Sequence, residues 1–268
     1  MATNDTRTLA GRRIVVTRAP EQSAELVRAL EELGAEVLLL PMVRFTGPPE
    51  SFELDRAIGA LEEFDWLVFT SANAVRFFLA RCRELGRWPQ APLRLAVVGP
   101  ATRDALEAEG LQAAVAPREF RGQALAAEIG GEVAGRRILL PRSDQAGGEL
   151  PELLRAAGAL VTGVVAYATA PPDSLDAPAL EALVRGQADA LAFFSPSAFR
   201  HFAESFGRDA LRRLTARVAL AAVGPVTAAA IRQAGLPVAV EAADATTPAL
   251  VAALERHFHL PAAGKGRS

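Results

Sequence analysis

The chain has 268 residues, enough for two domains of ordinary size. Half of the residues are hydrophobic, 22% are charged and the formal net charge is -2, which excludes a disordered or fibrous chain and indicates no nucleic-acid or membrane partner. The single cysteine, Cys82, excludes an internal disulfide, and the three histidines form no metal-ligand pattern, so no metal site is expected.

The first seven residues are mostly polar, and no apolar stretch resembles the core of a signal peptide. No run of residues approaches the ~18 apolar positions of a membrane span. We therefore expect a cytoplasmic protein with no membrane partner.

Predicted strands and helices alternate from the start of the chain. Short apolar runs predict strands at 13–17, 36–40, 65–70 and 93–98. Helical spacing and glycine stops predict helices at 20–33, 73–85 and 100–109. The strands are apolar throughout, as in parallel sheets that helices cover on both faces. This pattern predicts an α/β fold with doubly wound parallel sheets.

The sequence also repeats itself over a long distance. Ala10-Gly11-Arg12-Arg13-Ile14 recurs letter for letter 124 positions later, and the same spacing relates Ser71 to Ser195. In all, residues from about 10 to 115 reappear from about 134 to 240. This period is far longer than that of a solenoid, so we interpret it as a duplication that gives two similar lobes.

Two extended, proline-flanked segments, 41–48 and 164–172, predict interlobe linkers. A linker within each repeat is consistent with a chain that leaves one lobe, builds the other and returns, so that each lobe mixes both repeats. The predicted parts are lobe 1 from 8–42 with 171–260, lobe 2 from 47–166, and a disordered tail, 261–268.

In open parallel sheets, ligands bind beyond the carboxyl ends of the strands, where helix N-termini present free N–H groups. The candidate binding residues are those in the turns at these positions: Thr17, Arg18, Ser71, Asn73, Gly99, Thr102, Arg142, Ser143, Ser195, Ser197, Gly224 and Thr227. Helix capping is the alternative role for each of them. As a set facing one cleft, they would suit an anionic ligand with many carboxylates, which arginine pairs with in a bidentate manner.

Other catalytic motifs are absent. There is no G-x-G-x-x-G, and the single lysine, Lys265, lies in the tail, so no phosphate loop is present. Three histidines support no Ser-His-acid arrangement, and Cys82 lies among apolar helix residues, where a buried packing role is expected. Tyr167 is the single tyrosine and falls in the second predicted linker, where the alternative role is packing in a hinge.

Taken in order and spacing, these turns resemble the uroporphyrinogen-III synthase family over nearly the whole chain. The residues that carry the resemblance are Val16-Thr17-Arg18, Phe69-Thr70-Ser71-Ala72-Asn73, Val98-Gly99-Pro100-Ala101-Thr102, Tyr167-Ala168-Thr169, Phe194-Ser195-Pro196-Ser197 and Val223-Gly224-Pro225-Val226-Thr227.

The resemblance implies two flavodoxin-like lobes joined by a two-stranded linker, in a monomer. It implies cyclisation of hydroxymethylbilane, a linear tetrapyrrole with eight carboxylates, to uroporphyrinogen III, with loss of water and inversion of the last pyrrole ring. No metal or organic cofactor is implied. Because the substrate also closes without the enzyme, to the wrong isomer, holding its geometry is a large part of catalysis.

The resemblance also implies roles for particular residues. Tyr167 matches a linker tyrosine and becomes the candidate to protonate the departing hydroxyl, a contribution worth ~10²–10⁴-fold in rate. The residues that match substrate contacts are Ser71, Thr102, Ser195, Ser197 and Thr227. Val226 stands where some relatives have a hydroxyl residue, so a side-chain contact there is not implied.

Two alternatives remain from the sequence. A hinged, non-catalytic binding protein would need export, and no signal peptide is visible. A nucleotide-dependent or response-regulator-like module would need a phosphate loop or an acidic pocket followed by a lysine, and neither is visible.

Overall fold

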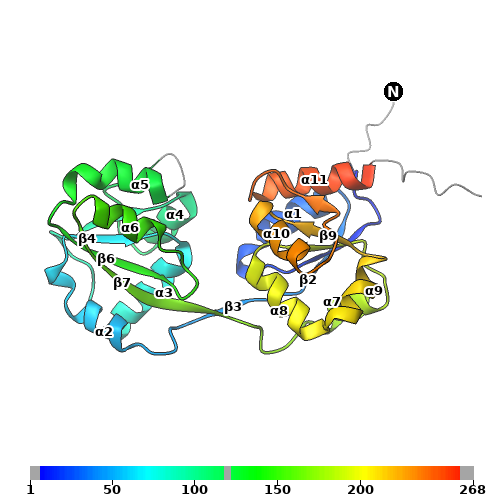
Figure 1. Ribbon diagram of the computed structural model, residues 1–268, viewed down its shortest axis with the longest axis horizontal. Helices are drawn as coiled ribbons and strands as arrows, with labels where there is room; N and C mark the ends of the chain where they lie inside the picture. Colours follow the sequence, from blue (N-terminus) through cyan, green and yellow to red (C-terminus); the bar gives the residue numbers. More distant parts are fainter. Residues whose placement is uncertain (1–6, 118–121, 260–268) are drawn as a thin grey trace, which may run out of the picture. The chain divides into compact units, whose positions relative to one another are not determined.

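A computed structural model describes residues 7–117 and 122–259, which form two compact units (Figure 1). Unit 1 is Met1–Arg44 with Ala170–Ser268, and unit 2 is Phe45–Thr169, so the chain passes between the units twice. The tail predicted at 261–268 lies outside the described residues. Each unit has a five-stranded sheet, and the prediction of an α/β fold with two parallel sheets is confirmed.

Unit 1 has the strand order β10-β9-β8-β1-β2, and every neighbouring pair is parallel. Its strands are β1 (Arg13–Val16), β2 (Glu36–Leu39), β8 (Ala190–Phe193), β9 (Ala219–Ala222) and β10 (Val240–Glu241). Its helices are α1 (Ala24–Glu32), α7 (Ala177–Val184), α8 (Pro196–Phe206), α9 (Arg208–Thr215), α10 (Pro225–Gln233) and α11 (Thr247–His259), with a 3-10 turn at Pro20–Gln22.

Unit 2 has the strand order β3-β7-β6-β4-β5, in which β7, β6, β4 and β5 run parallel to one another. Its strands are β3 (Arg44–Thr46), β4 (Trp66–Phe69), β5 (Arg94–Val97), β6 (Arg137–Ser143) and β7 (Leu160–Ala170). Its helices are α2 (Phe52–Gly59), α3 (Ala72–Glu84), α4 (Pro100–Ala108), α5 (Gly122–Ile129) and α6 (Glu149–Ala156), with 3-10 turns at Leu61–Glu63 and Gly130–Glu132.

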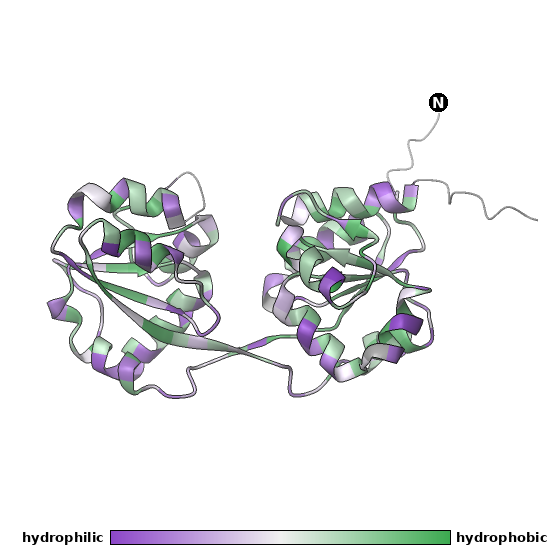
Figure 2. Cartoon of the chain, viewed as in Figure 1, coloured by the Kyte–Doolittle hydropathy of each residue, from purple (hydrophilic) through white to green (hydrophobic). Residues whose placement is uncertain are grey.

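Helices cover both faces of each sheet, which is why the strands are apolar at every position. In β1, Val15 packs in one hydrophobic cluster with α7, α8, α9 and α10, while Ile14 and Val16 pack in another with α1 and α11. Alternate residues of β4 divide in the same way, between a cluster with α2, α3 and α4 and a cluster with α5 and α6. Figure 2 shows the result, with hydrophobic strands inside and the hydrophilic residues mostly on the helices and loops.

The two sheets are built alike, and each contains strands from both sequence repeats. The spacing of the repeat relates β6 to β1, β7 to β2 and β4 to β8, and one further residue relates β5 to β9. The order β7-β6-β4-β5 in unit 2 is therefore the order β2-β1-β8-β9 of unit 1. Each sheet joins the beginning of one repeat to the end of the other.

The repeated Ala-Gly-Arg-Arg-Ile segment joins the repeats to each other. Arg12 Nη1 donates to Asp189 at 2.9 Å, and the Arg13 amide donates to the same carboxylate at 2.9 Å. In unit 2, Arg136 and the Arg137 amide bind Asp65 in the same way.

The glycine that ends the first helix of each repeat is also explained by its neighbours. Gly34 and Gly158 both have φ +88°, a region that favours glycine. A Cβ on Gly34 would lie 3.1 Å from the Ala10 Cα, and one on Gly158 would lie 3.4 Å from the Ala134 Cα. The same close approach between an alanine and a glycine therefore occurs once in each unit.

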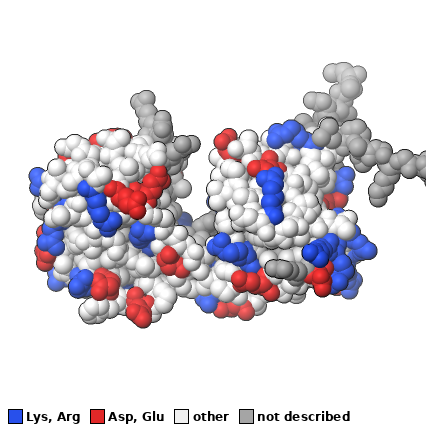
Figure 3. All heavy atoms as spheres, in the orientation of Figure 1, with Lys and Arg blue, Asp and Glu red and all other residues white. Residues whose placement is uncertain are grey.

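In the described part of the chain, no helix is long and apolar enough to cross a membrane. Acidic and basic side chains are interspersed on the face that Figure 3 displays, in agreement with the net charge of -2.

Candidate functional site

The predicted binding residues of unit 1 lie at the carboxyl end of its sheet, meaning the end at which its parallel strands finish. Thr17 and Arg18 directly follow β1, and Ser195 and Gly224 each lie two residues after the ends of β8 and β9. These three strands are consecutive neighbours, so their turns lie next to one another. Ser197 and Thr227 fall in the first turns of α8 and α10, which begin at this end.

Unit 2 presents a matching set at the carboxyl end of its own sheet. Ser71 and Gly99 each lie two residues after the ends of β4 and β5, and β6 ends on Arg142 and Ser143. Tyr167 lies on β7, directly opposite Ser143 in the strand pairing. The structure thus gathers the predicted residues into two groups, one in each unit.

Two kinds of helix start occur in both groups. Ser71 caps α3 by accepting the Ala74 amide at 3.1 Å, and Ser195 caps α8 by accepting the Ala198 amide at 3.1 Å. Both serines are therefore helix N-caps. Capping satisfies one backbone donor of each helix and leaves the serine hydroxyl proton available.

The other two helices, α4 and α10, start without a side-chain cap. Gly99 and Gly224 precede them with φ +86° and +80°, and in each case proline is the first helical residue. Their first-turn N–H groups therefore have no side-chain acceptor. Such groups, together with the helix dipole, favour carboxylates, by ~0.3–1 kcal/mol per terminus.

The polar side chains of the site differ in whether they make hydrogen bonds to other groups of the protein. Thr17 is fully buried and donates its hydroxyl proton to the Ala192 carbonyl at 2.8 Å, joining β1 to β8. This burial argues against the substrate contact that the sequence suggested for Thr17. The hydroxyls of Thr102 and Thr227 and the amide of Asn73 make no hydrogen bond in the described residues, although these side chains are mostly buried.

Two further serines are engaged locally. Ser143 donates to Asp144 at 2.9 Å, and its oxygen accepts the Gln145 amide at 3.1 Å. Ser197 accepts a hydrogen bond from Arg200 at 3.0 Å. Both hydroxyls stabilise their own turns.

Arg18 and Arg142 occupy equivalent positions in the repeat but differ in their surroundings. Arg142 donates to the carbonyls of Ala146 and Gly147, which holds the loop after β6. Arg18 has no ion-pair or hydrogen-bond partner in the described chain, and its guanidinium lies 5.2 Å from the ring centre of Phe194. Partial burial lowers the pKa of Arg18, and nearby Glu25 opposes that shift. A half-buried guanidinium that makes no ion pair or hydrogen bond in the described chain is suited to bind a ligand carboxylate.

Tyr167 is held in the unit 2 group by one polar and two aromatic contacts. Its side chain is 8% exposed, and its hydroxyl oxygen lies 3.1 Å from Ser71 Oγ. Phe77 stacks on the ring at 5.7 Å between centres, and Phe45 meets it edge-on at 5.8 Å. The ring is fixed by packing, and the hydroxyl lies beside the helix start of α3.

The surroundings of Tyr167 differ from those of the predicted linker residue. β7 continues to Ala170, and after a shift in register at Arg142 and Ser143 it still pairs with β6 at Tyr167. Tyr167 therefore makes these contacts within unit 2. Phe45 and Phe77 are not among the residues predicted from sequence, because neither lies in a turn that carries a polar motif.

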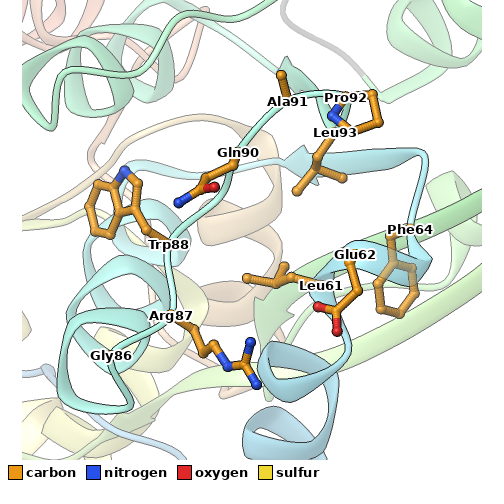
Figure 4. Close-up of a pocket in the computed structure, with 10 residues that line it drawn as sticks. All are labelled: Leu61, Glu62, Phe64, Gly86, Arg87, Trp88, Gln90, Ala91, Pro92 and Leu93. Carbon is orange, nitrogen blue, oxygen red and sulfur yellow. The ribbon is translucent and has the colours of Figure 1, made fainter.

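Other features of the described chain lie away from these groups. A cavity of about 270 Å³ in unit 2 is lined by Leu61, Phe64, Trp88 and Pro92, among others, and lies before β4 and β5, opposite the carboxyl end (Figure 4). Burial raises the pKa of the Cys82 thiol to about 12, against the effect of Arg83, so this thiol is not a nucleophile at neutral pH. The described residues contain no group of three or more His, Cys, Asp or Glu that could hold a metal.

Comparison with known proteins gives consistent matches. A family model described as uroporphyrinogen-III synthase HemD matches residues 24–252. A uroporphyrinogen-III synthase of Synechococcus elongatus is 35% identical over 92% of this chain and 96% of its own length. One of Chlorobaculum parvum is 30% identical over 84% of this chain and 90% of its own.

Solved structures show the same fold. The crystal structure of uroporphyrinogen-III synthetase from Helicobacter pylori has a TM-score of 0.62 at 17% identity and covers 93% of this chain and all of its own. A mutant uroporphyrinogen III synthase from Thermus thermophilus has a TM-score of 0.59 at 22% identity, with the same coverage.

Proposed function

This chain belongs to the uroporphyrinogen-III synthase family. We propose that Tyr167 is the proton donor of the family's reaction, and that the two groups of residues at the carboxyl ends of the sheets bind the substrate. The enzyme is a hydro-lyase of tetrapyrrole biosynthesis that forms uroporphyrinogen III from hydroxymethylbilane.

The observation that carries the proposal is the placement of the Tyr167 hydroxyl. It belongs to a ring that Phe45 and Phe77 fix, and it lies at the end of the sheet where ligands bind in α/β folds. Loss of hydroxide from the substrate is difficult in neutral water, and a donor that protonates the departing oxygen lets it leave as water. Tyr167 has a suitable proton and a fixed position.

Substrate carboxylates have three kinds of donor available. The uncapped starts of α4 and α10 supply backbone N–H groups, and the unpaired side chains of Asn73, Thr102 and Thr227 supply amide and hydroxyl groups. Arg18 supplies a guanidinium that lies against Phe194 and makes no hydrogen bond or ion pair in the described chain. Each contact is weak by itself, so binding requires several to act together. Their combined effect is to hold the linear chain in the geometry that leads to the III isomer.

Replacement of Tyr167 by phenylalanine tests the proposal. Tyr167→Phe keeps both ring contacts and removes only the hydroxyl, so we expect formation of the III isomer to fall by more than about tenfold while the fold persists. Hydroxymethylbilane that the variant does not convert closes by itself to the I isomer. Chromatographic separation of the I and III isomers and the thermal unfolding midpoint are the measurements. An unchanged rate and isomer ratio would rule out the proton-donor role.

We also propose that the enzyme works as a monomer. The proposal depends on the family resemblance alone. Light scattering at the concentration of the activity assay tests it, and a mass of twice 28.3 kDa or more would contradict it.

A further inference from the structure

The Ser71 hydroxyl is shared between two groups. Its oxygen accepts the Ala74 amide at 3.1 Å, and the same oxygen lies 3.1 Å from the Tyr167 hydroxyl oxygen. A serine hydroxyl has one proton to donate and two lone pairs that accept. With the amide on one lone pair, the Ser71 proton is free to be donated to Tyr167.

We propose that Ser71 is a positioning residue that donates its hydrogen bond to the Tyr167 oxygen and so directs the phenolic proton toward the substrate. The inference rests on the proposed role of Tyr167 as the acid. If Tyr167 instead donated to Ser71, its proton would be engaged inside the protein. Donation by Ser71 leaves that proton for the departing hydroxyl.

The same hydrogen bond stabilises the charge that the reaction leaves behind. The phenolic proton moves to the substrate hydroxyl, the C–O bond breaks and water departs, so Tyr167 becomes a phenolate. Ser71 then donates to an anion, and a hydrogen bond to a charged group is stronger than one between neutral groups. The amide of Ala74 and the start of α3 polarise Ser71 in the required direction. Ring closure later releases a proton from carbon, which restores the phenol, so the net loss is one water.

Unit 1 shows that capping by serine does not require the tyrosine. Ser195 caps α8 with the same 3.1 Å bond as Ser71, but the residue equivalent to Tyr167 in the repeat is Val43. The residue equivalent to Phe77 is His201, whose Nδ1 lies 2.8 Å from the Met42 carbonyl oxygen. The contact to a phenol is thus a property of Ser71 in unit 2, separate from its capping role.

The test compares Ser71→Ala, Ser71→Thr, Tyr167→Phe and the double variant Ser71→Ala with Tyr167→Phe. We expect Ser71→Ala to lower kcat by about tenfold, the usual scale of one hydrogen bond to a developing charge, with KM within about twofold of the parent. Ser71→Thr keeps a hydroxyl and restores kcat. The double variant is no slower than Tyr167→Phe, because Ser71 acts through the phenol.

The split between kcat and KM provides a readout that loss of a cap would not give. A hydrogen bond that is stronger to the developing phenolate than to the phenol affects kcat and leaves KM near the value of the parent. A displaced start of α3 would change KM as well. Asp176→Ala is the matched control, because Asp176 caps α7 by accepting the Ala179 amide at 3.0 Å and belongs to neither binding group. We expect the control to keep the kcat and KM of the parent.

The outcomes separate the two proposals. If Tyr167→Phe lowers kcat and Ser71→Ala does not, the role of Ser71 alone is overturned. The same holds if the decrease in kcat of the double variant equals the product of the two single decreases. A parent-like Tyr167→Phe overturns the acid role and the inference that rests on it. If Ser71→Ala unfolds, Ser71→Gly replaces it, since glycine at an N-cap costs only a few tenths of a kcal/mol.

Discussion

Equivalent residues of the two repeats have taken different tasks, and the two arginines after the first strands illustrate this. Arg142 donates to the carbonyls of Ala146 and Gly147, whereas Arg18 lies against Phe194 without a partner in the described residues. Both arginines are predicted from the sequence as binding residues. The structure leaves the guanidinium of Arg18 available for a carboxylate and commits that of Arg142 to a loop.

We therefore expect Arg18→Gln to raise KM by about tenfold or more with a smaller effect on kcat, because a charged hydrogen bond contributes ~1.5–3 kcal/mol. Arg142→Gln should raise KM less and lower the thermal unfolding midpoint more, since its donors hold the loop after β6. Steady-state kinetics on both variants decides between them. Equal changes in KM would contradict the difference in their roles.

At the scale of elements, paired contacts hold the start of one repeat to the end of the other. Asp65, just before β4, accepts the Arg137 amide at 2.8 Å and an Arg136 hydrogen bond at 2.9 Å. The hydrogen bond from the Arg137 amide is the largest cause that lowers the pKa of Asp65; burial, the next largest effect, opposes it, and the two arginines add to the lowering. The carboxylate thus joins β4 to β6, its neighbour in the sheet.

This lowered pKa predicts a pH dependence of stability. A carboxyl group whose pKa is lower in the folded state contributes stability above its unfolded value of about 3.9 and loses it as the pH falls through the folded value. We expect Asp65→Asn to reduce the free energy of unfolding at pH 7 by about 1 kcal/mol or less, since the group is partly exposed. The difference from the parent should shrink below about pH 4.

Urea unfolding at pH 7 and at about pH 3 measures this difference. Asp104→Asn is the control, because Asp104 is exposed and has no hydrogen-bond or ion-pair partner in the described chain. A deficit for Asp65→Asn that persists unchanged at low pH would show that the carboxylate charge is not the cause.

At the scale of the whole molecule, each unit has its own core. The clusters of unit 1 contain only residues of unit 1, and those of unit 2 only residues of unit 2. Unit 2 is continuous in sequence, whereas unit 1 is assembled from two separated segments. The segment that forms unit 2 therefore contains the helices that cover both faces of its sheet.

We expect a fragment of residues 44–170, which includes β3 and all of β7, to fold alone. Circular dichroism should show α/β structure, and urea should unfold the fragment in one cooperative transition. A fragment with helical signal but no cooperative transition would show that unit 2 depends on unit 1 for its packing.

Much of the fold follows from sequence pattern alone. Short apolar runs gave β1, β2, β4 and β5 to within two residues, because strands covered on both faces must be apolar at every position. The prediction for 20–33 was less accurate, since the structure begins with a 3-10 turn and α1 starts at Ala24. Helix spacing does not distinguish a 3-10 turn from the first turn of an α-helix.

The sequence by itself determined the duplication, the parallel α/β class and the turns at which polar residues gather, because these depend on local spacing and on the rule that parallel strands end together. Only the tertiary structure decided that the Thr17 hydroxyl is hydrogen-bonded within a sheet. It also decided that Arg142 donates to loop carbonyls while Arg18 makes no hydrogen bond or ion pair in the described chain. The contacts of Phe45, Phe77 and Ser71 with Tyr167 were likewise visible only there. These are contacts between residues far apart in the chain. Whether a hydroxyl or a charge is free depends on which neighbour folding brings to it, and no local pattern encodes that.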